Sequence, residues 1–86
     1  MFYDYAELQD ATQIAYSNVL EDGTVQVSVE RPVELGFDSA ICALPAFEWS
    51  KVEGFTQQDM KRINDFVHAN APLILRLARE ASKTYA

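Results

Sequence analysis

The segment from residue 56 to about residue 84 carries apolar side chains at helical spacing, and this pattern constrains the fold more than any other feature. Thr56 and Asp59 have the spacing of a capping box, and Phe55 is placed to pack on Met60. Apolar residues then recur every three or four positions, at Met60, Ile63, Phe66 and Val67. We therefore expect an amphipathic helix that begins at Thr56 and buries this face.

Pro72 interrupts the helical pattern. Proline has no amide proton and crowds the preceding turn, so the chain must either kink there or start a second helix with Asn70 or Ala71 as its cap. We favour the restart. The second apolar stripe consists of Leu73, Ile74, Leu77, Ala78, Ala81 and Tyr85, and Leu75 makes it wider than one contact surface requires.

Apolar and polar residues alternate strictly from residue 24 to residue 30, which predicts a half-buried strand. The core-facing residues of this strand are Val25, Val27 and Val29. The preceding Asp22-Gly23 pair suits a tight hairpin turn, so residues 13 to 19 should form the antiparallel partner strand. Pro32 cannot donate to a ladder, and we expect the valine strand to end before it.

Further strands are expected on both sides of this hairpin. Residues 37 to 44 predict a third strand, apolar on both faces, and residues 47 to 49 a short edge segment or fourth strand. The first eleven residues fit a strand or a helical turn. The expected fold is a single α+β domain over residues 1–86, with a three- or four-stranded antiparallel sheet. Two C-terminal helices, or one helix kinked at Pro72, should pack on one face of it.

Length and cysteine content indicate the number of domains and the cellular location of such a chain. With 86 residues the chain has material for one core. Cys42 is the single cysteine and lies in an apolar run, so we expect a buried, inert thiol and no internal disulfide. We find no signal-peptide pattern and no apolar run long enough to cross a membrane. These features predict a cytoplasmic protein that does not bind membranes.

Charge is distributed unevenly along the chain. The net charge is −6, but residues 1 to 55 carry −8 and residues 56 to 86 carry +2. An acidic surface repels nucleic acid backbones, so direct binding to DNA or RNA is not expected. The acids serve either as a solvated surface that keeps the protein soluble or as a face for a basic protein.

No group of residues indicates a reaction. His68, Ser39 and Asp38 could suggest a nucleophile set, but Ser39 and Asp38 are neighbours that point to opposite faces of a strand. The chain has no cluster with metal-ligand spacing and no glycine-rich phosphate loop. We therefore expect a non-enzymatic protein without catalytic residues, metal or cofactor.

Surface recognition is the function that these exclusions leave. Phe47 and Trp49 would anchor an interface if exposed, or else cover the sheet edge as part of the core. The second apolar stripe could pack on a symmetry mate as well as on the sheet. The candidate interaction residues are Phe47, Trp49, Leu73, Leu75, Arg76 and Arg79.

The expected function is that of a small bacterial accessory or regulatory protein that contacts another protein, including its own copy as a homodimer. Residues 47 to 80, a Gly-Phe pair followed by an amide-rich basic helix, loosely resemble small bacterial proteins of toxin-antitoxin gene pairs. That resemblance implies a toxin or antitoxin. A small nuclease toxin would gather His68, Arg31 or other basic residues in one cleft.

A third alternative is an inhibitor that mimics nucleic acid. It requires a continuous stripe on the exposed sheet face, made of Glu21, Asp22, Glu30, Glu34, Asp38, Glu48 and Glu53.

Overall fold

The computed structural model describes residues 1 to 84 and has an α+β fold, as the sequence predicts. Five strands precede one helix along the chain. The strands are β1 (Phe2–Glu7), β2 (Gln13–Ser17), β3 (Val25–Val33), β4 (Gly36–Leu44) and β5 (Glu48–Glu53), and the helix is α1 (Gln57–Thr84).

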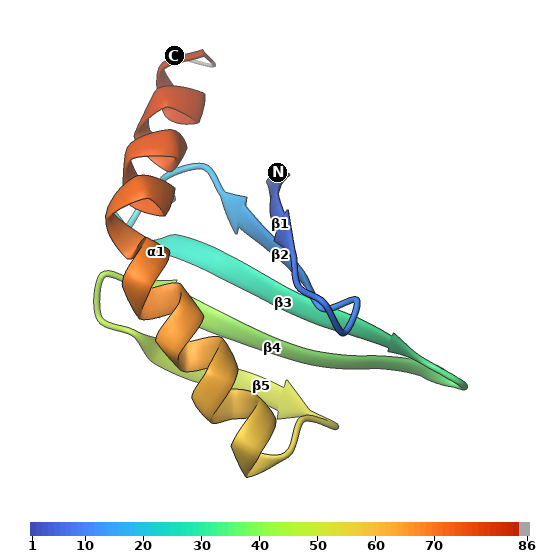
Figure 1. The fold of residues 1–86 in the computed structure, drawn as a ribbon. Helices are drawn as coiled ribbons and strands as arrows, with labels where there is room; N and C mark the ends of the chain where they lie inside the picture. The colour runs from blue at the N-terminus through green and yellow to red at the C-terminus, as the bar shows by residue number, and fades with distance from the viewer. Residues whose placement is uncertain (85–86) are drawn as a thin grey trace.

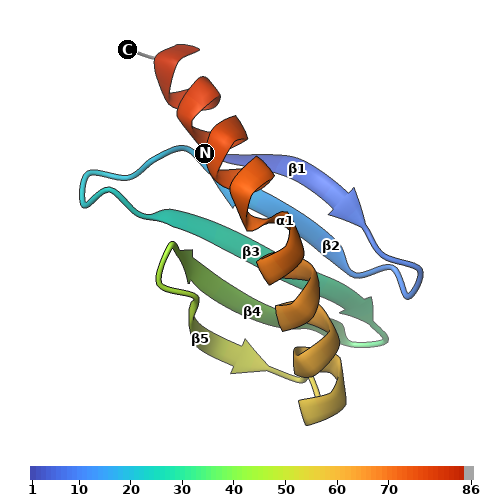
Figure 2. The same ribbon diagram turned by 60° about the vertical axis from the view of Figure 1, so that its left-hand side comes forward.

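The strands form one antiparallel sheet in the order β1-β2-β3-β4-β5, so each strand pairs with its neighbour in sequence. Helix α1 crosses one face of this sheet diagonally (Figures 1 and 2). No element of residues 1 to 84 covers the opposite face. The fold therefore has two layers, with one side of the sheet left bare.

The core lies between α1 and the sheet face that it covers. Val25, Val27 and Val29 of β3 are fully buried there, in the same cluster as Ile63 and Val67 of α1. Met60, Phe66 and Leu77 pack against this cluster, which confirms the predicted contact between the valines and the helix. Burying one such aliphatic side chain stabilises the fold by about 1.5 to 3 kcal/mol.

Helix α1 begins with the predicted capping box. The Asp59 amide donates to Thr56 Oγ1 at 3.1 Å, and the Thr56 amide donates to Asp59 Oδ2 at 3.0 Å. Two amides that have no partner within the helix are satisfied in this way.

Pro72 does not divide the helical segment, so the prediction of a second helix capped by Asn70 or Ala71 is wrong. α1 is continuous through Pro72, although its axis changes direction near the middle of its length (Figure 1). Asn70 is occupied elsewhere, because its Nδ2 donates to the Phe66 carbonyl and its Oδ1 accepts from the Tyr5 hydroxyl at 2.6 Å. Buried side chains on both sides of the proline keep the two halves on the sheet.

The sheet has more strands than the three or four that the sequence predicts. Residues 2 to 7 form strand β1 rather than a helical turn, and on the covered face Tyr3 stacks on the Tyr16 ring while Tyr5 meets that ring edge-on. Ring contacts between neighbouring strands thus accompany the extended conformation of the first segment. Residues 48 to 53 form an edge strand, β5, so of the two alternatives expected at residues 47 to 49 the full strand is the correct one, and it extends further along the chain.

Strand β3 continues through Pro32, so the prediction that it ends there is also wrong. β2 reaches only as far as the pair Gln13 and Glu30, and beyond it β3 has a partner on one side, β4. A proline is tolerated on such a free edge because no neighbouring carbonyl needs its amide. Pro32 pairs with Phe37 in the ladder.

Other features of the sequence are confirmed. Gly23 has φ 83° in the turn between β2 and β3, and its amide donates to the Leu20 carbonyl. Cys42 is fully buried, and burial raises the pKa of its thiol to about 11.

Tyr85, assigned above to the apolar stripe of the helical segment, lies outside the described residues. Although α1 has 28 residues, it lacks the apolar stretch that a bilayer-spanning helix requires.

Candidate interaction surface

Strands β3 and β4 run beyond the rest of the sheet as a two-stranded ribbon, which we call the hairpin arm (residues 31 to 38). Pairing of β2 with β3 ends at Glu30, and pairing of β5 with β4 ends at Ser39. The arm continues with three further pairs and projects from the body (Figure 1). It is therefore accessible from several sides.

The tip of the hairpin arm is apolar. Leu35 is 99% exposed, Phe37 63% and Val33 45%, and they are three of the seven large apolar side chains that are exposed among the described residues. Hairpin tips usually carry polar turn residues, so this composition is not explained by the turn itself. The register places Phe37 and Val33 on opposite faces of the ribbon, with Leu35 in the turn between them. Exposed apolar side chains at a projecting tip of this kind mark a surface for binding another molecule.

Five charged residues form a cluster at the base of the arm: Asp10, Arg31, Asp38, Asp59 and Arg62. Arg31 lies at its centre, with Nη2 at 2.7 Å from Asp38 Oδ2 and 3.0 Å from Asp59 Oδ2. Its Nη1 lies 3.2 Å from Asp10 Oδ2. The guanidinium thus ties β3 to β4, to the loop after β1 and to the first turn of α1.

The ion-pair cluster is reinforced by a second guanidinium and a ring. Arg62 Nη2 lies 2.8 Å from Asp59 Oδ1 and 3.3 Å from Asp10 Oδ2. The Arg31 guanidinium carbon lies 5.0 Å from the centre of the Phe55 ring, within the range of a cation–π interaction. An isolated two-stranded ribbon is only marginally stable, so these contacts hold the arm in one position.

The cluster changes the proton affinity of its members. Hydrogen bonds from Thr12, and then from Arg31 and Arg62, lower the pKa of Asp10 to about 2. Hydrogen bonds from Arg31 and from the Thr56 amide lower the pKa of Asp59 well below its usual range. Hydrogen bonds to Asp59 and Asp38 raise the pKa of Arg31. All of these shifts favour the charged, paired state.

Gly54 packs directly against the cluster. Its φ of 86° lies in the left-handed region, and a methyl group on it would overlap the Asp38 carboxylate. Only glycine combines this backbone conformation with this close approach. The turn before α1 is therefore built to bring the helix start against the base of the arm.

The bare side of the sheet, which we call the open face, is the second candidate surface. The strand register places a row of mostly small side chains across its middle: Asp4, Ala15, Ser28, Ile41 and Ser50. A neighbouring row is more polar and contains Glu7, Gln13, Glu30, Ser39 and Glu53. Ala43 and Glu48 form a further pair on this face.

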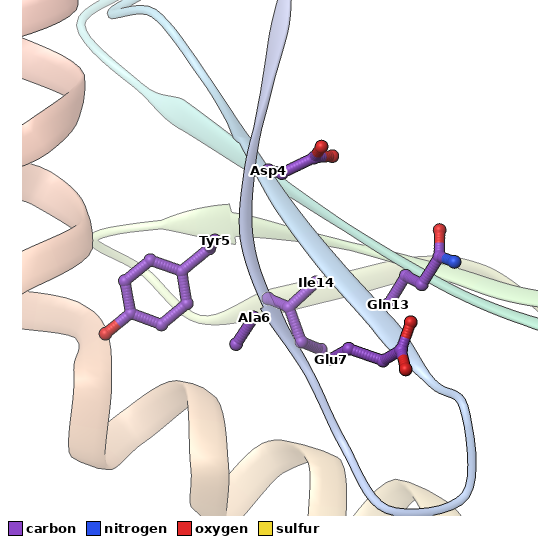
Figure 3. Close-up of a pocket in the computed structure, with 6 residues that line it drawn as sticks. All are labelled: Asp4, Tyr5, Ala6, Glu7, Gln13 and Ile14. Carbon is purple, nitrogen blue, oxygen red and sulfur yellow. The ribbon is translucent and has the colours of Figure 1, made fainter.

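A hollow of about 300 Å³ lies at the β1 edge of the sheet, where the pairing of β1 with β2 shifts register between Asp4 and Ala6. Figure 3 shows Tyr5 turned toward α1, while Asp4, Glu7 and Gln13 lie on the opposite side of the sheet. The hollow combines no nucleophile with a base. It is a gap opened by the irregular strand and belongs to the acidic rim of the open face.

Both edges of the sheet are poorly suited to pairing with another strand. β1 carries the register shift just described, and β5 carries another, with Lys51 at φ 52°. Such irregularities interrupt the row of backbone groups that an added strand would need. The accessible surfaces are therefore the open face and the hairpin arm.

Phe47 and Trp49, two predicted interaction residues, lie at the interface between sheet and helix. Phe47 stacks on the His68 ring with 3.6 Å between the ring centres. Trp49 donates from Nε1 to Asn64 Oδ1 at 2.9 Å, and both aromatic side chains pack against the core. The structure therefore places them as half-buried side chains that close the β5 edge against α1.

The other predicted interaction residues lie on α1. Leu73 is exposed, as are Arg76 and Arg79, whereas Leu75 packs against the core. Their spacing puts Leu73, Arg76 and Arg79 on the outer surface of the helix. The stripe that looked too wide in the sequence thus leaves one leucine exposed, and an interaction role for these four residues stays a prediction.

Two of the alternative functions, a nuclease toxin and a nucleic-acid mimic, require groupings of side chains that the described residues do not form. Arg31 is held in the cluster beside Asp59, and His68 lies nine residues further along α1, roughly 13 Å away by helix rise, against Phe47. These two side chains therefore do not share a nuclease-like cleft.

The acidic stripe of a nucleic-acid mimic is also not formed, and the prediction of a continuous stripe is wrong. Asp38 lies on the covered side of the sheet with Arg31. Glu21 and Asp22 lie in the turn before β3, and Glu34 lies at the tip of the arm. Only Glu30, Glu48 and Glu53 of the proposed set share the open face.

Sequence reasoning missed both the hairpin arm and the cluster at its base. The one available signal for the arm was the set Val33, Leu35 and Phe37 around a short connection that lacks polar turn residues other than Glu34. The sequence contains no comparable signal for the ion-pair cluster, because the residues of the cluster come from four separate segments.

The chain matches no protein family model, no curated protein sequence and no solved structure.

Proposed function

We propose that this protein is a non-enzymatic accessory or regulatory factor that acts through protein contacts, with the hairpin arm as a principal contact. One observation carries the proposal: Val33, Leu35 and Phe37 are all exposed at the end of a projecting ribbon. The partner is another protein or a second copy of the chain. The cytoplasm is the proposed location, supported by the single buried Cys42.

The energetics of the arm support a binding role. Exposed Leu and Phe side chains add little to the stability of the isolated fold, and a fully exposed one gains about 1.5 to 3 kcal/mol when buried against a partner. The ion-pair cluster fixes the arm before binding occurs. A surface held in its bound position loses less conformational entropy on association, so more of the contact energy appears as affinity.

Site-specific photo-crosslinking in cells of the source organism tests the proposal. A photoreactive phenylalanine analogue replaces Leu35 at the tip of the arm in one variant. In the control variant it replaces Glu21, which is exposed in the turn at the other end of β3. We expect a discrete crosslinked species from position 35 and none from position 21, because only the arm lies in a protein interface.

The mass of the adduct identifies the partner. An adduct of twice the monomer mass indicates a second copy of the chain, and any other discrete mass indicates a different protein. Both results support a function in protein contacts. The absence of adducts at position 35, or equal and diffuse labelling from both positions, would contradict the proposal.

A further inference from the structure

The open face differs in charge from the rest of the molecule. Its acidic side chains are Asp4, Glu7, Glu30, Glu48 and Glu53, and its one basic side chain is Lys51. None of these acids forms an ion pair with another residue among residues 1 to 84. The face thus carries a net charge of −4 that the described fold does not neutralise.

The middle of the open face is shallow. Ala15, Ser28, Ala43 and Ser50 have short side chains, and Ile41 supplies an apolar centre among them. Such short side chains let a packed helix lie close to the sheet. The covered face of the same sheet already packs against a helix, α1.

A hollow in the open face provides a place for a basic side chain. Its volume is about 280 Å³, and it is lined by Ser28, Ser39 and Ile41 together with Glu30, Glu53 and Lys51. Glu30 and Glu53 flank Ser39 in one row of the sheet. A guanidinium or ammonium group entering between these two carboxylates would gain charge-assisted hydrogen bonds.

Other occupants fit the open face less well. Two copies meeting face to face would bring together two surfaces of charge −4, which repel each other. Nucleic acids and anionic membranes are repelled for the same reason. Strand addition would use the edges of the sheet, and both are irregular.

We propose that the open face is the docking site for an amphipathic helix of a partner protein, with an apolar stripe of small and aliphatic residues flanked by arginine or lysine. The apolar stripe packs over Ile41 and its small neighbours, and one basic side chain enters the hollow between Glu30 and Glu53. This inference rests on the proposed function in protein contacts and specifies the chemistry of the partner. The open face would then be a second contact surface, separate from the hairpin arm.

A designed peptide serves as the probe. It has about 18 residues, a leucine and alanine stripe and arginine flanks, and spans roughly 27 Å as a helix. That length crosses five strands spaced about 4.8 Å apart. Fluorescence anisotropy measures binding to the full chain, and amide chemical shifts map the site. We expect saturable binding, with the largest shift changes at Ser28, Ile41 and Ser50 and none on the outer surface of α1.

Two charge variants separate a defined site from general attraction. The double variant Glu30→Gln/Glu53→Gln should weaken binding about tenfold or more and reduce its dependence on salt. The control Glu21→Gln/Glu80→Gln removes the same charge away from the open face and should weaken binding less than about twofold. A peptide with the same composition in scrambled order should not saturate the site.

Several results would overturn the inference: equal weakening by both double variants, equal binding of the scrambled peptide, or shift changes confined to α1 or the arm. Self-association of the protein that buries the open face would also overturn it. These outcomes are distinct from a failure of the proposed function. A crosslink at position 35 can still form when the open face does not bind the peptide.

Discussion

Two groups of acidic residues in this small protein have opposite surroundings. Asp10, Asp38 and Asp59 converge on Arg31 and Arg62 at the base of the hairpin arm. The acids of the open face have no such partners among the described residues. Acidic residues of one chain can thus serve the fold in one region and be left available for binding in another.

The charge is uneven along the chain as well as between these two regions. Residues 56 to 86 have two more basic than acidic residues, but of the basic residues only Arg62 contacts an acid that lies before residue 56 among the described residues. The remaining basic residues lie along α1, on the opposite side of the sheet from the open face. The layered fold therefore keeps the acidic and basic surfaces apart instead of neutralising them.

Replacing Arg31 should have the largest effect on stability. The variant Arg31→Met leaves three carboxylates facing one another with only Arg62 to offset them, and we expect unfolding free energy to fall by about 3 kcal/mol. Urea unfolding followed by circular dichroism measures the loss. Arg76→Met is the matched control, because Arg76 is exposed on α1 and forms no ion pair within residues 1 to 84; it should change stability by less than about 0.5 kcal/mol. Equal losses would show that the cluster stabilises the fold no more than an exposed arginine does.

Gly54→Ala tests how closely the cluster is packed. A positive φ costs a residue other than glycine about 1 to 2 kcal/mol, and the added methyl group also displaces Asp38 from its position beside Arg31. Gly23→Ala is the control, since Gly23 has a similar φ of 83° but open space around it. We expect Gly54→Ala to lower the melting temperature clearly more than Gly23→Ala. Similar shifts for both variants would mean that crowding at Asp38 contributes nothing.

Acid should destabilise the fold through the cluster, because the carboxylates of Asp10 and Asp59 have lowered pKa values in the folded state. The pKa of Asp10 is lowered to about 2 from an ordinary 3.8, so the ionised carboxylate favours the folded state. Its contribution is complete above about pH 4 and is lost as the pH falls toward 2. Urea midpoints measured across this interval should fall less steeply in Asp10→Asn than in the unchanged protein. Parallel curves would exclude Asp10 as a source of the acid sensitivity.

Local signals in the sequence predict the elements of this fold well. The capping box of Thr56 and Asp59, the alternating valines and the Asp-Gly turn each act through neighbours in the chain, and all three are confirmed. Their physical causes are short-range backbone and side-chain contacts. Such features can be inferred without knowledge of the tertiary structure.

Features that depend on distant contacts could not be predicted in this way. Pro32 stays within β3 because strand β2 ends beside it and no neighbouring strand needs its amide. Pro72 stays within α1 because the helix is packed on the sheet both before and after the proline. Arg31 meets Asp10 and Asp59 only after the sheet and helix have come together. The hairpin arm likewise becomes visible only when the lengths of neighbouring strands are compared.

The most direct test of the central claim applies two measurements to the variant Glu30→Gln/Glu53→Gln. We predict that its urea midpoint equals or slightly exceeds that of the unchanged protein, because neutralising unpaired acids removes only repulsion, about 0.3 kcal/mol. The same sample should bind the basic helical peptide about tenfold more weakly or worse. A lower urea midpoint together with unchanged peptide binding would contradict the division of acids into a folding group and a binding group.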